Sequence, residues 1–326
     1  MTSMTYSEAA RLALQQEMAR DPRVWALGED LGGVGGSAGQ YRGLQEEFGG
    51  ERILDTPSSE STLMGAAVGA AMCGTRPVVE LRSADLGLCA TDEIVNQAAK
   101  IRYMFNGQAR VPVVIRQPIG ILKGGAAQHG QSTEAWWVHV PGLVVVAPAT
   151  PADNHGLLKA AIRCDDPVVY LEHKELWNIR GEVDPEREAL LGRAQRLSDG
   201  KDLTIVTWSK MRHVCASAAQ QLLEQGVRAE VIDLRTLWPW DHEMVLQSVR
   251  STGRLLVVHE AVRVAGLGAE IAAEVGEALW RELKGPVRRL AGPRSPVPYA
   301  EPLENVFRIS PQQVAQAAME IIKESR

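Results

Sequence analysis

Short apolar segments alternate with helical segments over most of the chain, and this alternation limits the possible folds more than any other feature. β-branched apolar runs between helices are typical of parallel strands that helices cover on both faces. We expect strands at residues 24–27, just before Pro57, and at 77–81, 111–115, 143–147, 167–171, 203–207, 229–233, 255–259 and 287–290. We expect helices from Ser7 past Met18, from Ser61 or Thr62 to Gly74, and at 91–105, 152–162, 211–225, 241–249, 269–283 and 311–324. The sequence therefore predicts an α/β fold.

The length of 326 residues is enough for two domains, each with its own core. The stretch from His173 to Gly192 is charged and irregular, as an interdomain linker would be. We therefore predict two doubly wound domains, residues 1–185 and a smaller unit at residues 186–326.

Composition excludes several classes of function. The net charge of −5 gives no reason to expect nucleic-acid binding, and no stretch is long and apolar enough for a membrane span. The four cysteines form no CxxC pair, which argues against a zinc site and against a disulfide scaffold. No cleavable hydrophobic segment is present at the N-terminus, and we expect a soluble, cytoplasmic protein.

Glu60 precedes a helix that consists almost entirely of small and apolar residues. A helix without a polar face is expected to be buried on most sides, which places Glu60 at the entrance to the interior. The carboxylate could simply complement the helix dipole. Alternatively, it could be catalytic, because a buried carboxyl group can share a proton with a ring nitrogen. The residues themselves leave both interpretations open.

Two further acid–base candidates follow expected strands. His129 lies in a glycine-rich loop, Gln117 to Thr133, and a long loop inside a compact domain is usually functional. Glu29 follows the first strand, and α/β sheets bind ligands beyond the carboxyl ends of their strands. The alternatives are a surface histidine and a solvated loop acid. His173 and His259, which end strands, are weaker candidates.

Several motifs together resemble one protein family. Eight segments occur in the order found in that family. They are Leu27-Gly28-Glu29-Asp30, Asp55-Thr56-Pro57-x-x-Glu60, Gly65-Ala66-Ala67-x-Gly69, Ala127-Gln128-His129-x-Gln131, Pro141-Gly142-Leu143, Asp165-Asp166-Pro167, residues 231–236 and residues 252–255. The chain resembles the β subunit of the decarboxylase component of 2-oxo acid dehydrogenase complexes. The resemblance implies a pyrimidine-binding domain followed by a transketolase C-terminal domain.

The resemblance also implies a thiamine diphosphate enzyme and assigns roles to the candidate residues. Glu60 matches the glutamate that hydrogen-bonds the aminopyrimidine ring and shares a proton with it. Glu29 matches a glutamate of an acidic path between two active sites, and Glu29, Ser59 and Leu86 would contact the cofactor. His129 matches the histidine that assists acyl transfer to a lipoyl group.

The resemblance further implies a bound cation and protein partners. In the family, backbone oxygens surround a structural monovalent cation, such as potassium. The matching positions in this chain are Val113, Ala161, Ile162, Cys164 and Asp166. The Gly-Asp-Gly…Asn motif that holds magnesium and the diphosphate is absent, because the family carries it on an α subunit. The resemblance therefore implies an α2β2 heterotetramer and an acyltransferase component that docks on the C-terminal domain.

Three departures from the family pattern concern the substrate and the acyl acceptor. Leu86 stands where many members have an aromatic residue, Arg82 adds a charge nearby, and Gly130 replaces a serine after His129. Cys73-Gly74 and the segment 102–105 are most similar to acetoin dehydrogenase β chains.

Three hypotheses follow. The first is a β subunit that acts on a 2-oxo acid or acetoin and passes the acyl group to lipoamide. The second is a two-subunit transketolase-like enzyme that passes a two-carbon ketol or acyl unit to another acceptor, such as a carrier protein. The third is a non-catalytic assembly or regulatory subunit.

Overall fold

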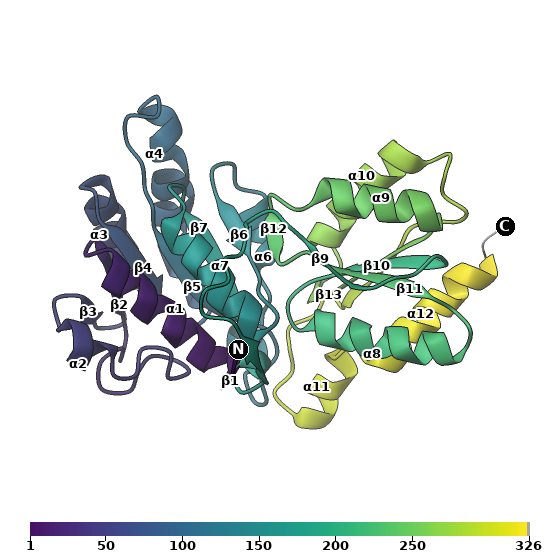
Figure 1. Cartoon of the computed structure of the whole chain (residues 1–326), viewed down its shortest axis with the longest axis horizontal. Helices are drawn as coiled ribbons and strands as arrows, with labels where there is room; N and C mark the ends of the chain where they lie inside the picture. Colours follow the sequence, from purple (N-terminus) through teal and green to yellow (C-terminus); the bar gives the residue numbers. More distant parts are fainter. Residues whose placement is uncertain (325–326) are drawn as a thin grey trace. The chain divides into compact units, whose positions relative to one another are not determined.

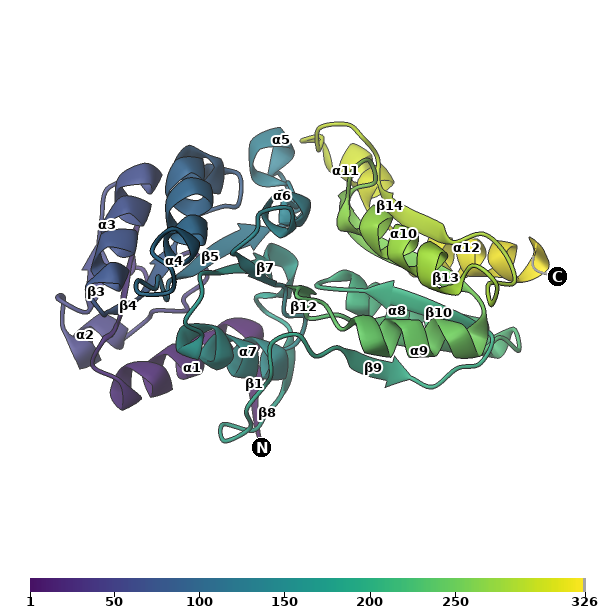
Figure 2. The same ribbon diagram turned by 90° about the horizontal axis from the view of Figure 1, so that it is seen from above.

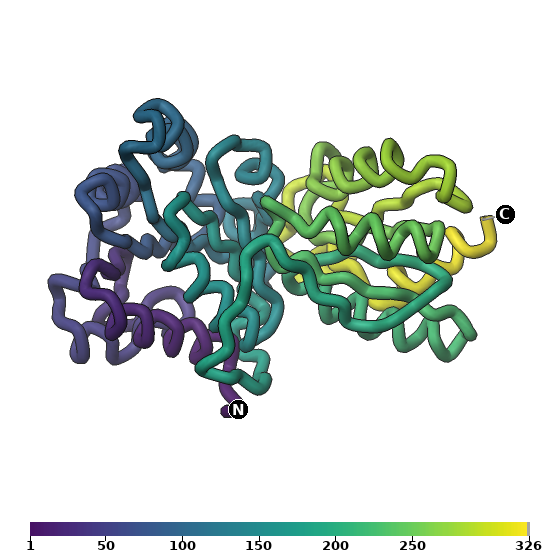
Figure 3. The backbone as a smooth tube through the Cα atoms, turned by 45° about the horizontal axis from the view of Figure 1, so that its top comes forward, coloured from purple at the N-terminus to yellow at the C-terminus, as the bar shows by residue number. Residues whose placement is uncertain are grey.

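A computed structural model describes residues 1–324, and the chain divides into two compact units. Unit 1 contains Met1–Ile119 and Trp136–Leu191, and unit 2 contains Gly120–Ala135 and the chain from Gly192 onward. Extended and helical segments alternate along both units (Figure 3). The predicted α/β fold class with two parallel-sheet domains is confirmed. The segment Gly120–Ala135 groups with unit 2, although it precedes the last part of unit 1 in the sequence.

A parallel sheet forms the centre of unit 1 (Figure 1). Six of its strands run in the order β6-β7-β5-β4-β2-β3. Their bounds are β2 (Val24–Gly28), β3 (Ile53–Asp55), β4 (Arg76–Glu80), β5 (Val114–Ile119), β6 (Val144–Val146) and β7 (Val168–His173). β1 (Thr2–Thr5) and β8 (Arg180–Val183) form a separate antiparallel pair. β8 lies inside the stretch from His173 to Gly192 that we predicted to be a linker.

Helices cover the sheet of unit 1 on both faces (Figure 1). α1 (Tyr6–Arg20) and α7 (Pro151–Arg163) pack together on one face, where Leu14, Met18, Leu157 and Leu158 meet the inward strand residues. α3 (Glu60–Met72) packs against β4. The remaining helical segments of unit 1 are α2 (Leu44–Phe48), η1 (Leu86–Ala90), η2 (Glu93–Ala98), α4 (Ala99–Met104) and η3 (Lys174–Leu176). α6 (Glu134–Val138) begins in the segment Gly120–Ala135 and ends after residue 136, where the chain returns to unit 1.

The predicted N-caps of two helices are wrong. Thr5 caps α1, because its hydroxyl accepts from the Glu8 backbone N–H while the Glu8 carboxylate accepts from Thr5 N; Ser7 lies within the helix. α3 begins at Glu60 with Ser59 at its N-cap, so that neither Ser61 nor Thr62 is the cap.

α3 is also less buried within this chain than its composition predicts. One face, which includes Met64, Ala67 and Ala71, packs inward, whereas Gly65 and Gly69 lie on an exposed face. The small residues form an apolar helix face that another protein surface could approach closely. The composition of the helix predicts that this face is covered, but not whether this chain or another one covers it.

Unit 2 contains a second, smaller sheet with the order β14-β13-β10-β11-β9 (Figure 2). β10 (Leu203–Thr207), β11 (Ala229–Asp233), β13 (Leu255–Val262) and β14 (Arg288–Gly292) are parallel, and β9 (Gln195–Ser198), which we did not predict, is an antiparallel edge strand. α8 (Met211–Glu224) and α12 (Pro311–Glu324) pack on one face, and α9 (His242–Thr252) and α10 (Leu267–Leu279) lie on the other. The unit also contains β12 (Thr236–Trp238), α5 (Ala126–His129) and α11 (Glu301–Phe307). None of the described helices is long and apolar enough to cross a membrane.

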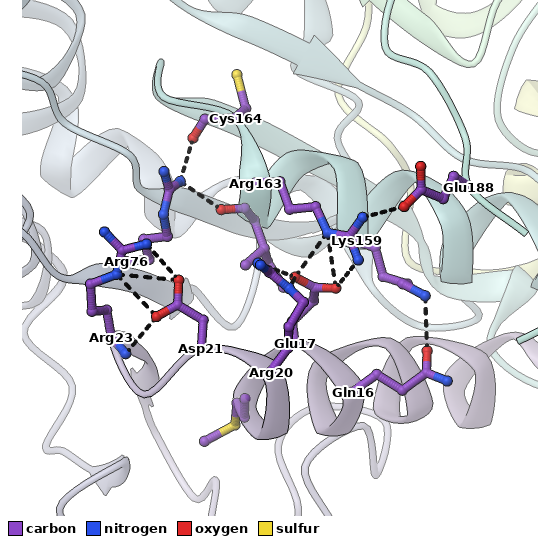
Figure 4. Close-up of polar contacts among 12 residues, drawn as sticks. Gln16, Glu17, Arg20, Asp21, Arg23, Arg76, Lys159, Arg163, Cys164 and Glu188 are labelled. Carbon is purple, nitrogen blue, oxygen red and sulfur yellow. Dashed lines mark hydrogen bonds and ion pairs between the residues drawn. The ribbon is translucent and has the colours of Figure 1, made fainter. Parts of the chain in front are cut away.

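Ion pairs tie the two helices of unit 1's packed face together (Figure 4). The buried Glu17 carboxylate of α1 accepts from the Arg163 guanidinium of α7, at 2.7 Å, and also pairs with Arg20. A hydrogen-bonded guanidinium, Arg23, lowers the pKa of Asp21 to about 2 at the end of α1. The Glu17–Arg163 pair fixes the relative position of α1 and α7 in addition to the apolar contacts beneath them.

A buried cluster of charges lies under the loops at one edge of unit 1's sheet. The Arg116 guanidinium is fully buried and pairs with Glu172 at 2.7 Å and with Glu80 at 3.7 Å. Gln40 and Asn154 each donate a hydrogen bond to Glu172 Oε1, and the Arg116 guanidinium lies over the Tyr41 ring. Burial raises the pKa of the Glu172 carboxyl, against the opposing effect of Arg116. Removing any one of these charged groups would therefore leave its partner buried without a counter-charge, which would destabilise the fold.

Replacing Arg116 by methionine should lower the free energy of unfolding by about 3–5 kcal/mol, because two carboxylates would stay buried without their cation. Chemical denaturation would measure the change. The control is Arg102→Ala, which removes the half-exposed pair with Asp166 and should cost less than about 1 kcal/mol. Equal losses in both variants would show that the buried cluster has no special role.

Candidate active site

The candidate site begins at three neighbouring strands of unit 1 that end at the same level. Gly28 of β2 pairs with Asp55 of β3 on one side and with Glu80 of β4 on the other, in parallel register. The chain passes from β2 outward to β3 and then returns to β4 on the opposite side of β2. β2 and β4 therefore flank a point where the strand order reverses, which is where α/β sheets bind ligands.

Close approach of the backbone makes glycine necessary at the end of β2. A Cβ atom on Gly28 would lie 2.8 Å from the Glu80 carbonyl oxygen. Glu29, the next residue, is half-buried and begins the loop above this edge. The Gly28-Glu29 pair thus combines a tight strand contact with a carboxylate at the edge of the candidate site.

Hydrogen bonds and an ion pair connect the loops that leave these strands. The Gly32 backbone N–H donates to Asp55 Oδ1 at 2.8 Å, and the Ser37 N–H donates to Glu80 Oε1 at 2.7 Å. Arg82 Nη1 lies 3.5 Å from Asp30 Oδ2. The extra charge is therefore paired with the acid that follows Glu29.

Glu60 is the first residue of α3, in the segment that leaves β3. It is half-buried, as is Ser59, and no side chain caps the helix: the Ser59 hydroxyl donates instead to the Ser58 carbonyl oxygen at 2.7 Å. The partial positive charge of a helix N-terminus favours a carboxylate at this position. Glu60 is thus held by helix geometry near the solvent-accessible edge.

Leu86 and a glutamine that we did not predict complete the edge. Leu86 begins η1, beyond the end of β4, and is half-buried. Gln117 of β5 is fully buried, and neither its amide oxygen nor its amide nitrogen has a hydrogen-bond partner among the described residues. A Cβ atom on Gly87 would lie 2.7 Å from Gln117 Nε2. We predicted that the strand would end at residue 115 and that Gln117 would begin a loop, whereas β5 runs from Val114 to Ile119 and buries this residue.

Four of the predicted site residues therefore lie at one edge of unit 1's sheet, each in a segment that follows one of three adjacent strands. Glu29 follows β2, Ser59 and Glu60 follow β3, and Leu86 follows β4. His129 belongs to unit 2, where it is exposed at the end of α5. We call residues 120–133 the His129 loop. Of the weaker histidine candidates, His173 and His259 are both buried.

Carboxylates of unit 2 hold the His129 loop at both ends. Glu260 Oε1 accepts from the Ile121 N–H at 2.9 Å and from the Ser132 hydroxyl at 3.5 Å. Glu304, which is buried, accepts from the Gly124 N–H at 2.9 Å. The Gly120 N–H donates to the Gln131 carbonyl oxygen at 2.9 Å and closes the loop.

The oxygens that the resemblance assigned to a monovalent cation come from two neighbouring segments of unit 1. Arg76 donates to the carbonyl oxygen of Cys164 at 3.0 Å (Figure 4). It also donates to the carbonyl oxygen of Ile162 at 3.0 Å and pairs with Asp165 at 2.6 Å. The Val113 oxygen accepts from Val168 N, and the Ala161 oxygen from Cys164 N. A carbonyl oxygen has two lone pairs, so each of these four retains one that could face a cation. Among the described residues, no group of three His, Cys, Asp or Glu side chains could hold a metal ion.

Comparison with known proteins identifies the family. Residues 2–179 match the transketolase pyrimidine-binding domain, and residues 192–314 match the transketolase C-terminal domain. The chain is 46% identical over 323 residues to the β subunit of the acetoin:2,6-dichlorophenolindophenol oxidoreductase of Cupriavidus necator, covering 95% of each chain. It is 42% identical over 324 residues to the 2-oxoisovalerate dehydrogenase β subunit of Bacillus subtilis, covering 98% of this chain and 99% of the relative.

Two further matches agree with this assignment. The mitochondrial pyruvate dehydrogenase E1 β subunit of Dictyostelium discoideum is 40% identical over 328 residues, covering 99% of this chain and 92% of the relative. A split-gene transketolase structure, described as an inactive β4 tetramer, has the same fold, with a TM-score of 0.80, 24% identity and 99% coverage of both chains. The chain thus belongs to the E1 β subunits of the thiamine diphosphate-dependent 2-oxo acid and acetoin dehydrogenases.

Proposed function

We propose that this chain supplies the pyrimidine half of a thiamine diphosphate site and passes an acyl group from an acetoin- or pyruvate-type substrate to lipoamide. The observation that carries the proposal is the position of Glu60. Its carboxylate begins α3 at the edge where Glu29 and Leu86 also lie. The bound cofactor supplies a carbon nucleophile and an electron sink.

The residues at this edge fit an aminopyrimidine ring. Glu60 offers a carboxylate that can share a proton with a ring nitrogen, and Leu86 offers an apolar surface for the ring to pack against. Gln117 offers buried donor and acceptor atoms that no described residue satisfies. Buried polar groups are normally hydrogen-bonded, so this amide favours a polar ligand. Glu29 and Ser59 stand beside the same edge.

Glu60→Gln should reduce turnover of the assembled enzyme roughly 10²- to 10⁴-fold, the usual contribution of a positioned acid–base group. Steady-state kinetics with the α subunit present would measure the loss, and gel filtration would check that the complex is intact.

Glu46→Gln is the matched control, because Glu46 is an exposed acid in the first turn of α2. If Glu60 only complements its helix dipole, both variants should keep their activity and lose a similar, small amount of stability. A large, selective loss of turnover would also exclude a purely structural subunit.

The proposal includes an α subunit that holds the magnesium ion and the diphosphate, in an α2β2 heterotetramer. The β-subunit relatives support the partner, and this chain has no Gly-Asp-Gly…Asn motif. The exposed face of α3 and the exposed apolar side chains of Tyr103 and Met104 on α4 are surfaces that a partner subunit could cover.

Calorimetric titration of thiamine diphosphate with magnesium should therefore give binding heat only when the α subunit is present. The isolated chain has no Gly-Asp-Gly…Asn motif for the diphosphate, from which most of the electrostatic attraction would come. Tight binding by this chain alone would contradict the split site.

His129 is proposed to assist acyl transfer, because it lies on an exposed loop that an incoming lipoyl group could reach. Among the substrates of the named relatives, acetoin is favoured by the similarity at Cys73-Gly74 and residues 102–105. The substitution of leucine at position 86 and the Arg82–Asp30 pair would shape the pocket for that substrate.

We also propose a structural monovalent cation, such as potassium, at the oxygens of Val113, Ala161, Ile162, Cys164 and Asp166. If the ion binds, the melting temperature should be higher in potassium chloride than in tetramethylammonium chloride at equal ionic strength, because a ligand of the native state stabilises it. Backbone oxygens cannot be removed by mutation, so the ion is exchanged instead. Identical melting temperatures would contradict the site.

A further inference from the structure

Glu134 is a buried acid to which the proposed chemistry gives no role. It lies directly after the His129 loop, at the start of α6, and its side chain is 2% exposed. Its Oε1 accepts a hydrogen bond from Trp208 Nε1 at 3.0 Å. Its Oε2 is buried and has no hydrogen-bond partner among the described residues. A carboxyl group in such surroundings is more stable in its neutral, protonated form.

Trp208 connects Glu134 to the end of a central strand of unit 2. It directly follows β10, and its ring stacks on the buried His259 imidazole of β13, with the ring centroids 5.0 Å apart and the planes 10° from parallel. Burial lowers the pKa of His259 to about 4, so the imidazole is neutral at neutral pH. The stack is therefore a rigid, uncharged platform, and Glu134 is bonded to its edge.

We infer that Glu134 is a positioning residue, which fastens the His129 loop to the end of β10 through its hydrogen bond to Trp208. Other polar contacts of the loop include the carboxylates of Glu260 and Glu304, which accept from loop N–H groups and a hydroxyl, and the ion pair of Lys123 with Glu301 at 2.8 Å. Glu134 is the one carboxyl contributed by residues 120–135 themselves. Its anchor lies five residues from His129, so movement of Glu134 would change the position of that imidazole. This last consequence rests on the proposed function of His129.

The charge of Glu134 should control whether its hydrogen bond to Trp208 holds the His129 loop in place; we call this hydrogen bond the anchor. Burial raises the pKa of Glu134 to about 7; its own backbone N–H and Trp208 oppose this effect, and the Glu260 carboxylate adds to it. Other ionisable groups around the loop are the exposed His129 and Lys123, His259 behind Trp208, and Glu301 and Glu304 of α11. Below pH 7 a neutral Glu134 is compatible with its buried position. Above pH 7 an ionised Glu134 would be buried near a second carboxylate, which favours release of the loop.

The sign of the stability effect follows from the same shift. Because the folded-state pKa is raised above the unfolded value, Glu134 binds its proton more tightly in the native state. Its contribution to stability is present at low pH and is lost as the pH rises through about 7.

Hydrogen exchange of the full chain, followed by mass spectrometry on peptides from residues 120–133, tests the anchor without any assay of activity. In the wild type, the protection of these peptides should fall between pH 6 and pH 8, after correction for intrinsic exchange. Glu134→Gln keeps an acceptor for Trp208 and cannot ionise, so its protection should be equal at the two pH values. Glu134→Ala and Trp208→Phe should each lower protection roughly tenfold at pH 6, where the wild-type hydrogen bond is intact, the effect of losing one hydrogen bond.

Trp25→Phe is the matched control, since it removes a tryptophan hydrogen bond, to Thr75, in unit 1 and should leave these peptides unchanged. Unchanged protection in Glu134→Ala and Trp208→Phe, or an equal pH response in Glu134→Gln and the wild type, would overturn the inference.

Kinetics of the complex with the α subunit then separate this inference from the proposed role of His129. Glu134→Ala should lower acyl transfer to a lipoyl acceptor while turnover with an artificial electron acceptor stays unchanged. Lower loop protection with normal acyl transfer would confirm the anchor and contradict the role of His129. Normal loop protection would contradict the anchor, whatever the kinetics.

Discussion

The parallel register of β2, β3 and β4 is the constraint on which the candidate site depends. Gly28 is level with both Asp55 and Glu80, so the three following segments leave the sheet at one edge. The register requires close backbone contact, because only a residue without a Cβ atom fits against the Glu80 carbonyl at position 28. Glu29, Glu60 and Leu86 are brought to one edge because the strands that carry them end together.

Buried and half-buried charged groups hold loops within each unit. In unit 1, Glu80 accepts from a loop N–H while it pairs with Arg116, and Glu172 accepts from Gln40. In unit 2, Glu260 and Glu304 accept from N–H groups of the His129 loop. Loops at binding sites contain many N–H groups that lie outside regular secondary structure, and a buried carboxylate satisfies them at the cost of its own desolvation. Loss of one partner in such a network therefore costs more than loss of an exposed ion pair.

The sequence predicted most of the helices and strands because their apolar patterns are strong. β10, β11 and α12 begin and end where we predicted, since β-branched runs and an amphipathic repeat define them. β1, β8 and β9 were missed, because short edge strands with polar residues have no such pattern. The cap of α1 was assigned to Ser7 instead of Thr5, and only the capping-box geometry distinguishes the two.

The sequence by itself determined the α/β class, the family and the residue types of the site, because strand periodicity and local motifs are properties of neighbouring residues. It also indicated Glu60, Glu29 and His129 as acid–base groups. Only the tertiary structure decided that the first two share a sheet edge in unit 1 while His129 lies on a segment of unit 2. The contacts of Arg116, Gln117 and Glu134 depend on strands and loops far apart in the chain, and strand order brings them together. The burial that determines whether such a group is charged could not be predicted from the local sequence.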